Sequence, residues 1–344
     1  MSKVYINAGA AISAQATFDG GFLENAVINR QDVFLPAIEP DYKAFISPVA
    51  SRRMSKAVKM AIIASAQALN ESGVSVPDAI ITGTGAGCII DSEKFLKAII
   101  DNDEQFLTPT SFIQSTHNTV GAQIALGLNC KGYNFTYVNG AVSFESALLD
   151  AIMQIELQQA NNVLVGGVDE MTPYFLELQQ MIGHAKSDIA TVGSVQSEGA
   201  GFFVLANTPT ESTYAAIEDV TLYNKLSIAE LPSFITGFLR KHHLEPSQID
   251  LVVAGNNGDV FDDYYDKAAH LFRNYAITVQ YKQLTGEYFT VSAFALWLAS
   301  RIIKEQHIPE ILKPHAVKHK AIKNVLIYNQ YRGLDHSLIL LKRV

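Results

Sequence analysis

The sequence predicts an α/β fold built from two similar halves, and two observations lead to it. Short apolar runs of the length of buried strands alternate with helical stretches, which is typical of parallel sheets covered by helices on both faces. The same order of elements also occurs twice along the 344 residues. We therefore expect two related halves, residues 1–207 and 215–344, that form one compact unit.

The elements of the two halves correspond one to one. In the first half a helix leads through Pro77 and Asp78 into an apolar strand and a glycine-rich loop, and in the second a helix leads through Pro246 and Asp250 into the same elements. A stretch rich in Thr, Pro and Ser, residues 207–214, separates the halves. In chain order the pairs are the helices 55–72 and 231–243, the strands 79–81 and 251–253, the loops 83–87 and 255–258, the buried helices 144–157 and 293–303, the strands 162–166 and 324–328, and the closing strands 202–205 and 338–341.

The composition is unusual in its low charge. Charged residues make up 17% of the chain, against about 25% in an ordinary globular protein, while 48% of the residues are apolar. This balance excludes a disordered chain and indicates more apolar surface than a monomer needs. The longest uncharged apolar stretch, 288–300, has 13 residues. A membrane span needs roughly 20, so we expect a buried helix there and no membrane span.

Charge and cysteine content narrow the class of partner and the compartment. The 26 basic and 34 acidic residues give a net charge of −8, which argues against nucleic acid as the main partner. Cys88 and Cys130 form no CxxC pair and the N-terminus has no signal peptide, so we expect a cytoplasmic protein without disulfide, metal or cofactor. The nearest approach to a basic patch, a solvated loop or a docking site for an acidic partner, comprises Lys313, His315, Lys318, His319, Lys320 and Lys323.

Four motifs carry a family resemblance. They are Ser-Thr-His-Asn-Thr-Val-Gly-Ala at 115–122, Leu-Val-Gly-Gly-Val-Asp-Glu at 164–170, Glu-Gly-Ala-Gly before a strand at 198–205, and Lys-Gln-Leu-Thr-Gly at 282–286. In this order and spacing, over residues 52–341, the chain resembles the β-ketoacyl synthases of the thiolase superfamily. The resemblance implies a thiolase-like fold, in which two duplicated α/β halves form a layered α-β-α-β-α sandwich.

In the family that the chain resembles, the nucleophile is a cysteine between a strand and a buried helix, where the helix dipole favours a thiolate. Here the strand 135–137 is followed by residues 139–143 and then by a helix. Counting from that helix places the family cysteine at Ala141, which cannot form a thiolate. No other side chain is expected to replace it, since we interpret the nearest candidates as structural: Ser143, Glu145, Cys88 and Cys130.

The resemblance also implies two active-site histidines, and neither is retained. The first precedes an Asp-x-x-Glu pair; taking Asp263 and Asp266 as that pair puts the histidine at Gly255 or Asn256. The second lies five residues after the family lysine, Lys282, and falls on Glu287. We expect Lys282 and Glu287 to form a buried ion pair that fills the old site. Five other histidines do not fall at either family position: His117, His184, His242, His243 and His270.

The segment 329–337 stands where the family has a glycine-rich loop that supplies the oxyanion hole. Here it reads Asn-Gln-Tyr-Arg-Gly-Leu-Asp-His-Ser, one residue shorter and nearly without glycine. Glycine permits backbone angles that Arg and Leu adopt only at a cost, so we expect the loop to take another path and the oxyanion hole to be absent.

These losses favour a subunit that does not condense acyl groups. It resembles the chain-length-factor subunits that pair with an active ketosynthase in polyketide, aryl polyene and flexirubin-type pathways, where an acyl carrier protein delivers the chain. Two alternatives stay open. The old pocket could serve an acyl-thioester decarboxylase, hydrolase or acyltransferase through Lys282 or Glu287, and the chain could be a homodimeric protein that sequesters an acyl chain or carrier protein.

One segment of the chain is expected to form a surface with few charges. In thiolase-type folds the strand before the nucleophile turn lies at the subunit contact, and residues 133–149 of this chain contain Glu145 as their one charge. Permanent interfaces resemble a domain core cut in half. We therefore expect a dimer face here, against an active ketosynthase in a heterodimer or against a second copy in a homodimer.

Overall fold

The computed structural model describes residues 3–18, 21–313 and 321–344. Most of the basic cluster near the C-terminus, namely His315, Lys318, His319 and Lys320, lies outside the described residues.

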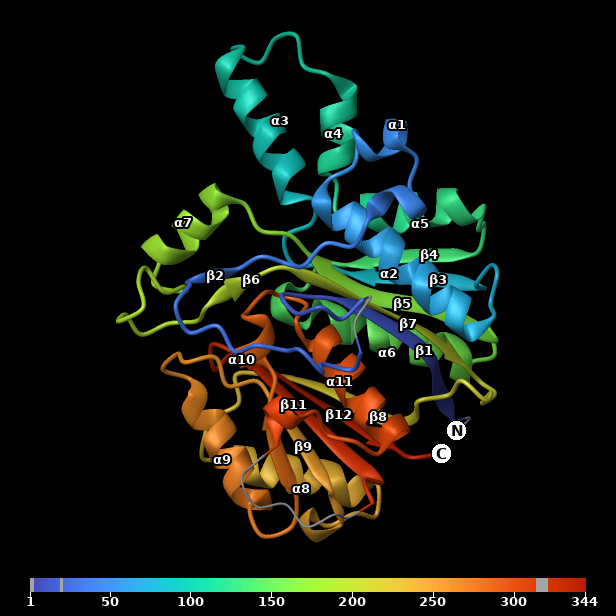
Figure 1. Cartoon of the computed structure of the whole chain (residues 1–344), viewed down its shortest axis with the longest axis vertical. Coiled ribbons are helices and arrows are strands. Elements are labelled where there is room, and N and C mark those ends of the chain that lie inside the picture. Colours follow the sequence, from blue (N-terminus) through green and yellow to red (C-terminus); the bar gives the residue numbers. More distant parts are fainter. Residues whose placement is uncertain (1–2, 19–20, 314–320) are drawn as a thin grey trace.

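Ten strands form one sheet in the order β10-β9-β11-β12-β8-β1-β7-β5-β3-β4 (Figure 1). A short parallel pair, β2 (Phe34–Leu35) and β6 (Gln196–Ser197), lies outside it. The ten strands are β1 (Val4–Ile12), β3 (Ala79–Gly83), β4 (Tyr133–Tyr137), β5 (Asn162–Asp169), β7 (Gly199–Ala206), β8 (Ala215–Asn224), β9 (Leu251–Ala254), β10 (Ile277–Gln280), β11 (Asn324–Tyr331) and β12 (Asp335–Lys342).

The strand order confirms the predicted duplication. In the first half the order is β1-β7-β5-β3-β4, and in the second the corresponding strands follow the same order, β8-β12-β11-β9-β10. The halves are joined where β1 and β8 pair in antiparallel fashion over three residues, from Val4 to Ile6 on one strand and from Ala215 to Ile217 on the other.

The expectation of parallel strands is correct for part of each half and wrong for the rest. β3 pairs in parallel with β4 and β5, and β9 with β10 and β11. β7 and β12, and also β1 and β8, run antiparallel to their neighbours. For β12 the reason is connectivity: residues 332–334 join β11 to β12 directly, and a connection this short can only form a hairpin. Strands β1 and β8 were not predicted, because Gly and Ala in the one and Glu218 and Asp219 in the other hide the strand pattern.

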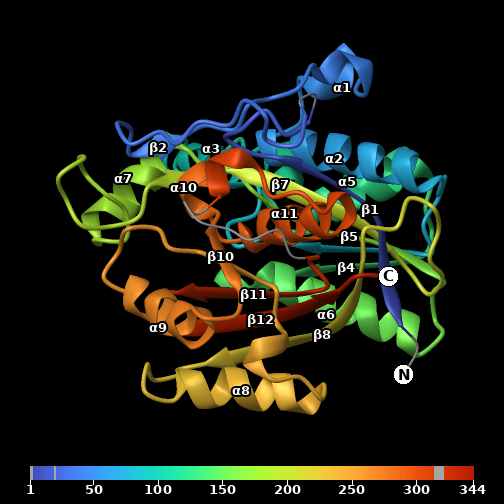
Figure 2. The ribbon, with the colours of Figure 1, turned by 60° about the horizontal axis from the view of Figure 1, so that its bottom comes forward.

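Helices complete five layers, as the layered sandwich predicts (Figures 1 and 2). Helices α2 (Lys56–Ser72) and α5 (Thr119–Leu128) pack on the outer face of the first half. Helices α6 (Ser143–Glu156) and α11 (Ser292–Glu305) lie between the halves. Helices α8 (Leu231–Lys241) and α9 (Asp262–Phe272) cover the outer face of the second half.

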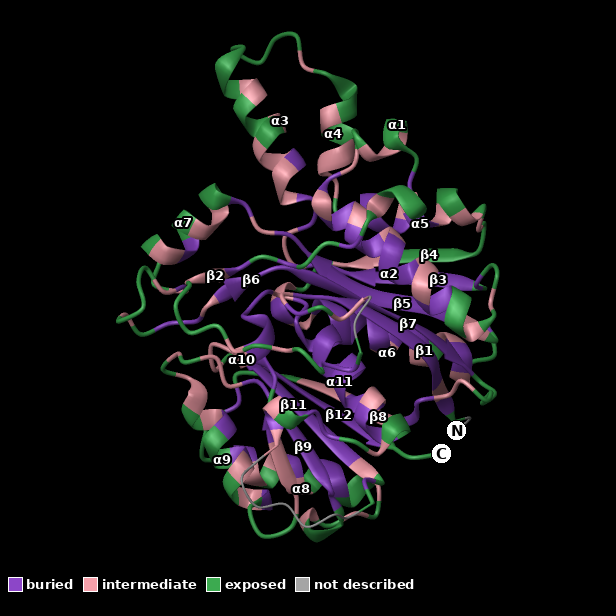
Figure 3. Ribbon diagram, in the orientation of Figure 1, coloured by how far each residue is buried: buried purple, intermediate pink, exposed green. Residues whose placement is uncertain are grey.

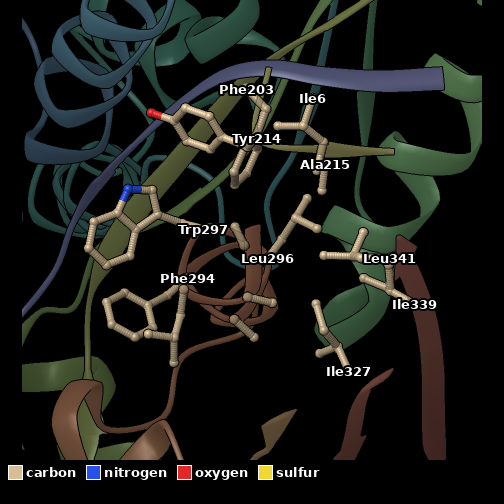
Figure 4. Close-up of a cluster of buried hydrophobic side chains, with 14 of the residues drawn as sticks. Ile6, Phe203, Tyr214, Ala215, Phe294, Leu296, Trp297, Ile327, Ile339 and Leu341 are labelled. Atoms are coloured by element: carbon tan, nitrogen blue, oxygen red, sulfur yellow. The ribbon is translucent and has the colours of Figure 1, made fainter. Parts of the chain in front are cut away.

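The largest apolar cluster surrounds α11, the helix predicted within the uncharged stretch (Figure 4). Phe294 and Trp297 of this helix share a cluster with Phe203 of the first half and with Ile327 and Leu341 of the second. The side chains of α11 from Ser292 to Ser300 are buried, so the helix belongs to the core of both halves. Within the described residues no helix is both long enough and apolar enough to cross a membrane.

Three of the remaining helices project from the body and are largely exposed (Figure 3). They are α3 (Ile89–Asp101), α4 (Pro109–Ser115) and α7 (Pro173–Met181). The shorter helical elements are α1 (Pro48–Ser51), α10 (Lys282–Thr285), η1 (Tyr42–Ala44), η2 (Gly140–Val142), η3 (Pro246–Gln248) and η4 (Glu310–Leu312).

Candidate functional site

The turn that leads into α6 is where the sequence analysis expects the family nucleophile, and its side chains are alkyl groups. Gly140 takes a positive φ of 56°, and Ala141 is buried with 3% of its surface exposed. Val142 follows and directly precedes the helix. Both side chains are alkyl groups, so this turn supplies no thiol or hydroxyl whichever of the two positions corresponds to a nucleophile.

The Ser143 hydroxyl is committed to the turn itself. Its Oγ donates to the carbonyl oxygen of Gly140 at 2.7 Å and accepts from the backbone N–H of Asn139 at 2.8 Å. The side chain is fully buried. Ser143 thus holds the turn closed, in agreement with its interpretation as a structural hydroxyl.

Lys282 and Glu287 form the expected ion pair. Lys282 Nζ lies 2.8 Å from Glu287 Oε2, and each residue has 3% of its surface exposed. Burial alone would lower the pKa of Lys282, but the Glu287 carboxylate outweighs burial and raises that pKa above its ordinary value. The ammonium also donates to the Tyr265 hydroxyl at 3.2 Å and lies within 5.8 Å of the ring centres of Tyr265 and Tyr281. The charge is therefore enclosed.

The loop after β9 contributes an amide to this pair, from a residue that the sequence analysis did not single out. Asn257 Nδ2 donates to Glu287 Oε2 at 2.7 Å. Gly255 packs on the Lys282 side chain, where an added Cβ would lie 2.9 Å from Cε. Asn256 instead donates to Asp266 on α9 at 3.2 Å. A shift of one further residue in the loop alignment would have identified Asn257.

The segment 329–337 forms a tight hairpin. Tyr331 of β11 pairs directly with Asp335 of β12, and the Gln330 side chain accepts from the backbone N–H of Gly333 at 2.8 Å. Arg332 has a φ of 54° and Gly333 one of 65°. Arg332 thus adopts an angle that the sequence analysis expects only at a cost, and the two-stranded ladder that fixes the ends of this three-residue turn holds it there.

The cavity beside Glu287 is almost filled by aromatic side chains. Its volume is about 10 Å³, the size of a single water molecule. The Phe289 ring lies between those of Phe175 and Tyr331, with centroids 6.4 and 5.7 Å away. Gly85 lies beneath it, since an added Cβ there would come within 2.2 Å of the Phe289 ring. The lining comprises Ala86, Asp169, Glu170, Met171, Phe175, Gln179, Gln196, Glu287, Tyr288, Phe289 and Tyr331.

Comparison with a family model decides the assignment. Residues 24–210, more than half of the chain, match the model described as the N-terminal domain of β-ketoacyl synthase. The chain belongs to the β-ketoacyl synthase family. The sequence matches none of the curated proteins with which it was compared.

Solved structures of β-ketoacyl synthases share the fold over the whole chain. The ishigamide ketosynthase/chain length factor superposes with a TM-score of 0.80 at 18% identity, covering 100% of this chain and 99% of that one. A β-ketoacyl synthase from Burkholderia phymatum STM815 gives 0.82 at 16% identity, covering 100% of both chains. A ketosynthase in complex with its chain length factor from Xenorhabdus doucetiae gives 0.76 at 14% identity, covering 100% of this chain and 98% of that one. At these identities the likeness shows the fold.

The acidic residues of the β-ketoacyl synthase motifs hold loops together. Asp169 Oδ1 accepts from the backbone N–H groups of Gly85 and Ala86 at 2.8 and 3.0 Å, and its Oδ2 accepts from the N–H and hydroxyl of Thr290 at 2.9 and 2.8 Å. Asp169 therefore ties the glycine-rich loop of the first half to the start of α11 in the second. Burial raises the pKa of its carboxyl group, although these hydrogen bonds oppose the shift.

Glu170 and Glu198, from the same motifs, anchor helix ends and loops. Glu170 accepts from the N–H of Ala57 in the first turn of α2 and from that of Ile90 in α3, at 2.8 and 3.1 Å. Burial raises its pKa to about 7. Glu198 lies 2.7 Å from Lys56 Nζ. The motifs that carry the family resemblance thus hold the scaffold together.

Glu145, in the first turn of α6, is the most deeply buried acid near the turn. It has no exposed surface; Oε1 accepts from the Ser337 hydroxyl at 2.7 Å, and Oε2 has no partner among the described residues. Burial raises the pKa of this carboxyl group. The helix position was expected from the sequence, but the contact with β12 depends on residues almost 200 positions apart.

Both cysteines and two of the histidines, His242 and His336, have structural surroundings. Cys88 is buried and its pKa is raised to about 12 by burial, and Cys130 Sγ contacts the carbonyl oxygen of Pro77 at 3.3 Å. His242 pairs with Asp219 at 2.7 Å. A histidine that the sequence analysis did not weigh, His336, is fully buried, with Nδ1 3.0 Å from the Tyr328 hydroxyl. Among the described residues no cluster of His, Cys, Asp or Glu could hold a metal ion.

Proposed function

We propose that this member of the β-ketoacyl synthase family is a non-condensing subunit that pairs with an active ketosynthase. The observation that carries the proposal is the site chemistry: alkyl groups fill the nucleophile turn at Ala141 and Val142, and an ion pair of Lys282 with Glu287 lies where the resemblance places a histidine. Condensation needs a nucleophile to hold the acyl group and donors to stabilise the enolate. This chain offers neither in the described site.

The similar structures support a ketosynthase as the partner. Two of them are described as a ketosynthase with a chain length factor. A third, at a TM-score of 0.80 and 14% identity over 100% of both chains, is described as a type II acyl-carrier protein in complex with its ketosynthase bound to the hexaketide. By analogy we propose that the active partner binds the growing chain on an acyl carrier protein, in a polyketide or aryl polyene type of pathway.

The edge strand β4 is the surface that we propose for the partner. It forms one end of the ten-stranded sheet, so among the described residues its outer edge is unpaired. Tyr133 and Phe135 are 42% and 46% exposed, and their rings are stacked with centroids 6.1 Å apart. Strand β4 is coloured largely as exposed in Figure 3. An exposed aromatic edge strand is a template for strand pairing with another chain. Glu145, the one charge in residues 133–149, is buried, so this segment itself exposes no charge.

A groove beside β4 extends the same face. Its volume is about 670 Å³, and it runs between α5 and β4 with Ala122, Leu126 and Phe135 in its walls. Leu126 is 73% exposed. An apolar edge strand with an adjoining groove supports a permanent interface, since such interfaces resemble a core cut in half.

Co-expression with the ketosynthase encoded in neighbouring genes tests the proposal. We expect a one-to-one complex by size-exclusion chromatography with light scattering, and we expect Phe135→Lys to abolish it because a charge would be buried at the interface. Tyr275→Lys, at a 51% exposed aromatic far along the chain, is the matched control and should leave the complex intact. A stable homodimer indifferent to the ketosynthase would contradict the proposal and favour the sequestering protein.

The alternative of an acyl-thioester enzyme that uses Lys282 or Glu287 has less support. Both side chains are enclosed, and the cavity beside Glu287 holds about 10 Å³. Turnover of a panel of acyl thioesters, abolished by Lys282→Met under conditions in which circular dichroism shows the variant to be folded, would establish that alternative. A cytoplasmic location is part of the proposal and is supported by the two free thiols, Cys88 and Cys130.

A further inference from the structure

Helices α3 and α4 form a hairpin that projects from the body of the molecule (Figure 1). Within this hairpin α3 packs chiefly on α4, and α4 in turn contacts α5. Side-chain hydrogen bonds tie the hairpin to the body: the Ile90 N–H donates to Glu170, the Thr172 hydroxyl donates to Glu93, and the Gln114 amide donates to the carbonyl oxygen of Arg53. Residues that directly follow strand β5 therefore hold the first turn of α3.

Glu170 is the buried member of this attachment, with 1% of its surface exposed. Its two carboxylate oxygens accept from different helices, Oε2 from the N–H of Ala57 in α2 at 2.8 Å and Oε1 from that of Ile90 in α3 at 3.1 Å. Cys88, the residue before α3, makes no side-chain hydrogen bond to the helix start. Glu170 thus supplies an acceptor from outside the helix and joins the start of α3 to the start of α2.

The charges that act most strongly on Glu170 are negative. Asp91, in the first turn of α3, has 8% of its surface exposed, and Glu198 has 2%. Both carboxylates raise the pKa of Glu170, because a second negative charge nearby disfavours ionisation. Burial also raises the pKa of Asp91 itself. An ionised Glu170 therefore shares a buried region with two other acids, one of which belongs to the projecting hairpin.

The lysines around this cluster are engaged elsewhere or exposed. Lys56 Nζ lies 2.7 Å from Glu198 and 2.8 Å from Glu39. Lys94 lies 3.7 Å from Asp91, and its side chain is 68% exposed. The titratable and charged groups in and around the cluster are Glu39 and Tyr42 ahead of α2, Lys56 and Lys59 of α2, Cys88, Asp91, Glu93 and Lys94 at the start of α3, Asp169 of β5, Glu198 ahead of β7, and Glu287 with its partner Lys282 across the closed cavity.

Burial is the largest influence on the Glu170 carboxyl group. The N–H groups of Ala57 and Ile90 oppose it, yet the pKa is raised from its ordinary value of 4.5 to about 7. The closed arrangement therefore binds the proton more tightly than an arrangement in which water reaches the carboxyl group. Ionisation leaves a buried charge, which is costly. Displacement of α3 relieves that cost, because water can then solvate the carboxylate and Asp91 moves away with the helix.

We propose that ionisation of Glu170 releases the start of α3 from the body, so that the α3–α4 hairpin opens as pH rises. Between the ordinary carboxyl pKa of 4.5 and about 7, the closed form keeps a proton that the open form has lost. Each pH unit in this window favours opening by up to about tenfold, and above it both forms are ionised and the effect levels off. The inference does not depend on the proposed function, because it uses neither β4 nor the Ala141 turn.

Hydrogen exchange with mass spectrometry on the full chain, corrected for the intrinsic pH dependence of exchange, tests the proposal from about pH 5 to about pH 8. We expect the protection of the α3 amides to fall at least about tenfold up to about pH 7 and to change little above it. The α3 amides should also exchange faster than those of α11 at every pH, because the opening is local. Protection of α3 that is independent of pH, that rises with pH, or that equals the protection of α11 would overturn the proposal.

Variants assign the effect to Glu170. Glu170→Gln keeps the shape of the side chain without its charge and should abolish most of the pH dependence. Asp91→Asn removes one of the neighbouring acids and should weaken the dependence, so it tests the proposal even if Glu170→Gln does not fold. Glu177→Gln, at an exposed acid of α7, is the control and should keep the profile of the unaltered protein. Thermal unfolding verifies which variants fold, and a pH profile unchanged in the folded Glu170 or Asp91 variant would overturn the proposal.

Discussion

A buried ion pair is stable only while both partners are present, and Lys282 with Glu287 fits that description. Both are enclosed, and Asn257 and Tyr265 complete their hydrogen bonds. Removal of one partner leaves an uncompensated charge in the interior, which costs about 3–5 kcal/mol. Replacement of both by apolar residues removes that cost.

We therefore expect Lys282→Met and Glu287→Leu each to lower the free energy of unfolding by about 3–5 kcal/mol, and the double variant to recover most of the loss. Urea denaturation of the three variants measures these changes. Additive losses in the double variant would show that the two side chains act independently and would contradict the coupling argued here.

Glu145 should make the stability of the folded protein depend on pH, and its raised pKa gives the direction of that dependence. Burial raises its pKa in the folded state, so between its ordinary pKa of 4.5 and the folded value the native protein binds the proton more tightly than the unfolded chain does. The stabilisation from this proton is complete below the unfolded pKa and is lost as pH rises through the folded pKa.

Glu145→Gln should remove that dependence, because glutamine keeps the shape without the charge. We expect the stability of the variant to fall less than that of the unaltered protein as pH rises from the ordinary carboxyl range upward, measured by urea unfolding across the pH series. Glu156→Gln, at a half-exposed position of the same helix, is the control. Parallel pH profiles for Glu145→Gln and the unaltered protein would contradict a buried, proton-binding Glu145.

At the scale of elements, the segment between α10 and α11 closes the cavity. Thr290 is held by Asp169, and the neighbouring Phe289 ring packs between Phe175 and Tyr331 over Gly85. The hydrogen bonds fix where the ring must lie, and the aromatic neighbours leave it no other space. The position of one loop thus determines that the cavity is closed to an acyl chain.

Phe289→Ala should open this cavity. We expect a destabilisation of up to about 3 kcal/mol, and we expect decanoate to raise the melting temperature of the variant but not that of the unaltered protein. Phe272→Ala truncates a buried phenylalanine of α9 and serves as the control, which should be destabilised without gaining a response to decanoate. Equal shifts in both variants would mean that decanoate binds elsewhere.

The helices could be predicted from the sequence better than some of the strands. Helices α2, α6 and α11 lie within two residues of their expected bounds, because an apolar periodicity over four turns is a local signal. Strands β1 and β8 were not predicted from the sequence. Each lies in the sheet through pairing with strands that are far along the chain.

For the whole molecule, the two halves share one core. Helix α11 of the second half packs against β1 and β7 of the first as well as against its own strands, and Asp169 bonds across the boundary. Each half alone would expose the apolar faces that the other covers, at about 25 cal/mol for every Å² returned to water.

A fragment of residues 1–207 should therefore fail to fold, although the duplication makes it look like a domain. We expect weak secondary structure by circular dichroism and strong binding of a hydrophobic dye. The full chain should unfold in a single cooperative transition. A cooperative unfolding transition in the isolated fragment would show that the first half folds independently.

The sequence by itself determined the duplication and the main helices, and it has an alkyl side chain at Ala141 and a carboxylate at Glu287, because periodicity and residue identity are properties of the chain. Only the tertiary structure decided that Asn257 meets Glu287, that Phe289 fills the cavity, that Glu145 faces Ser337 and that Glu170 joins α2 to α3. These features join residues that are distant along the chain, and which of them meet depends on how the two halves and their loops pack together.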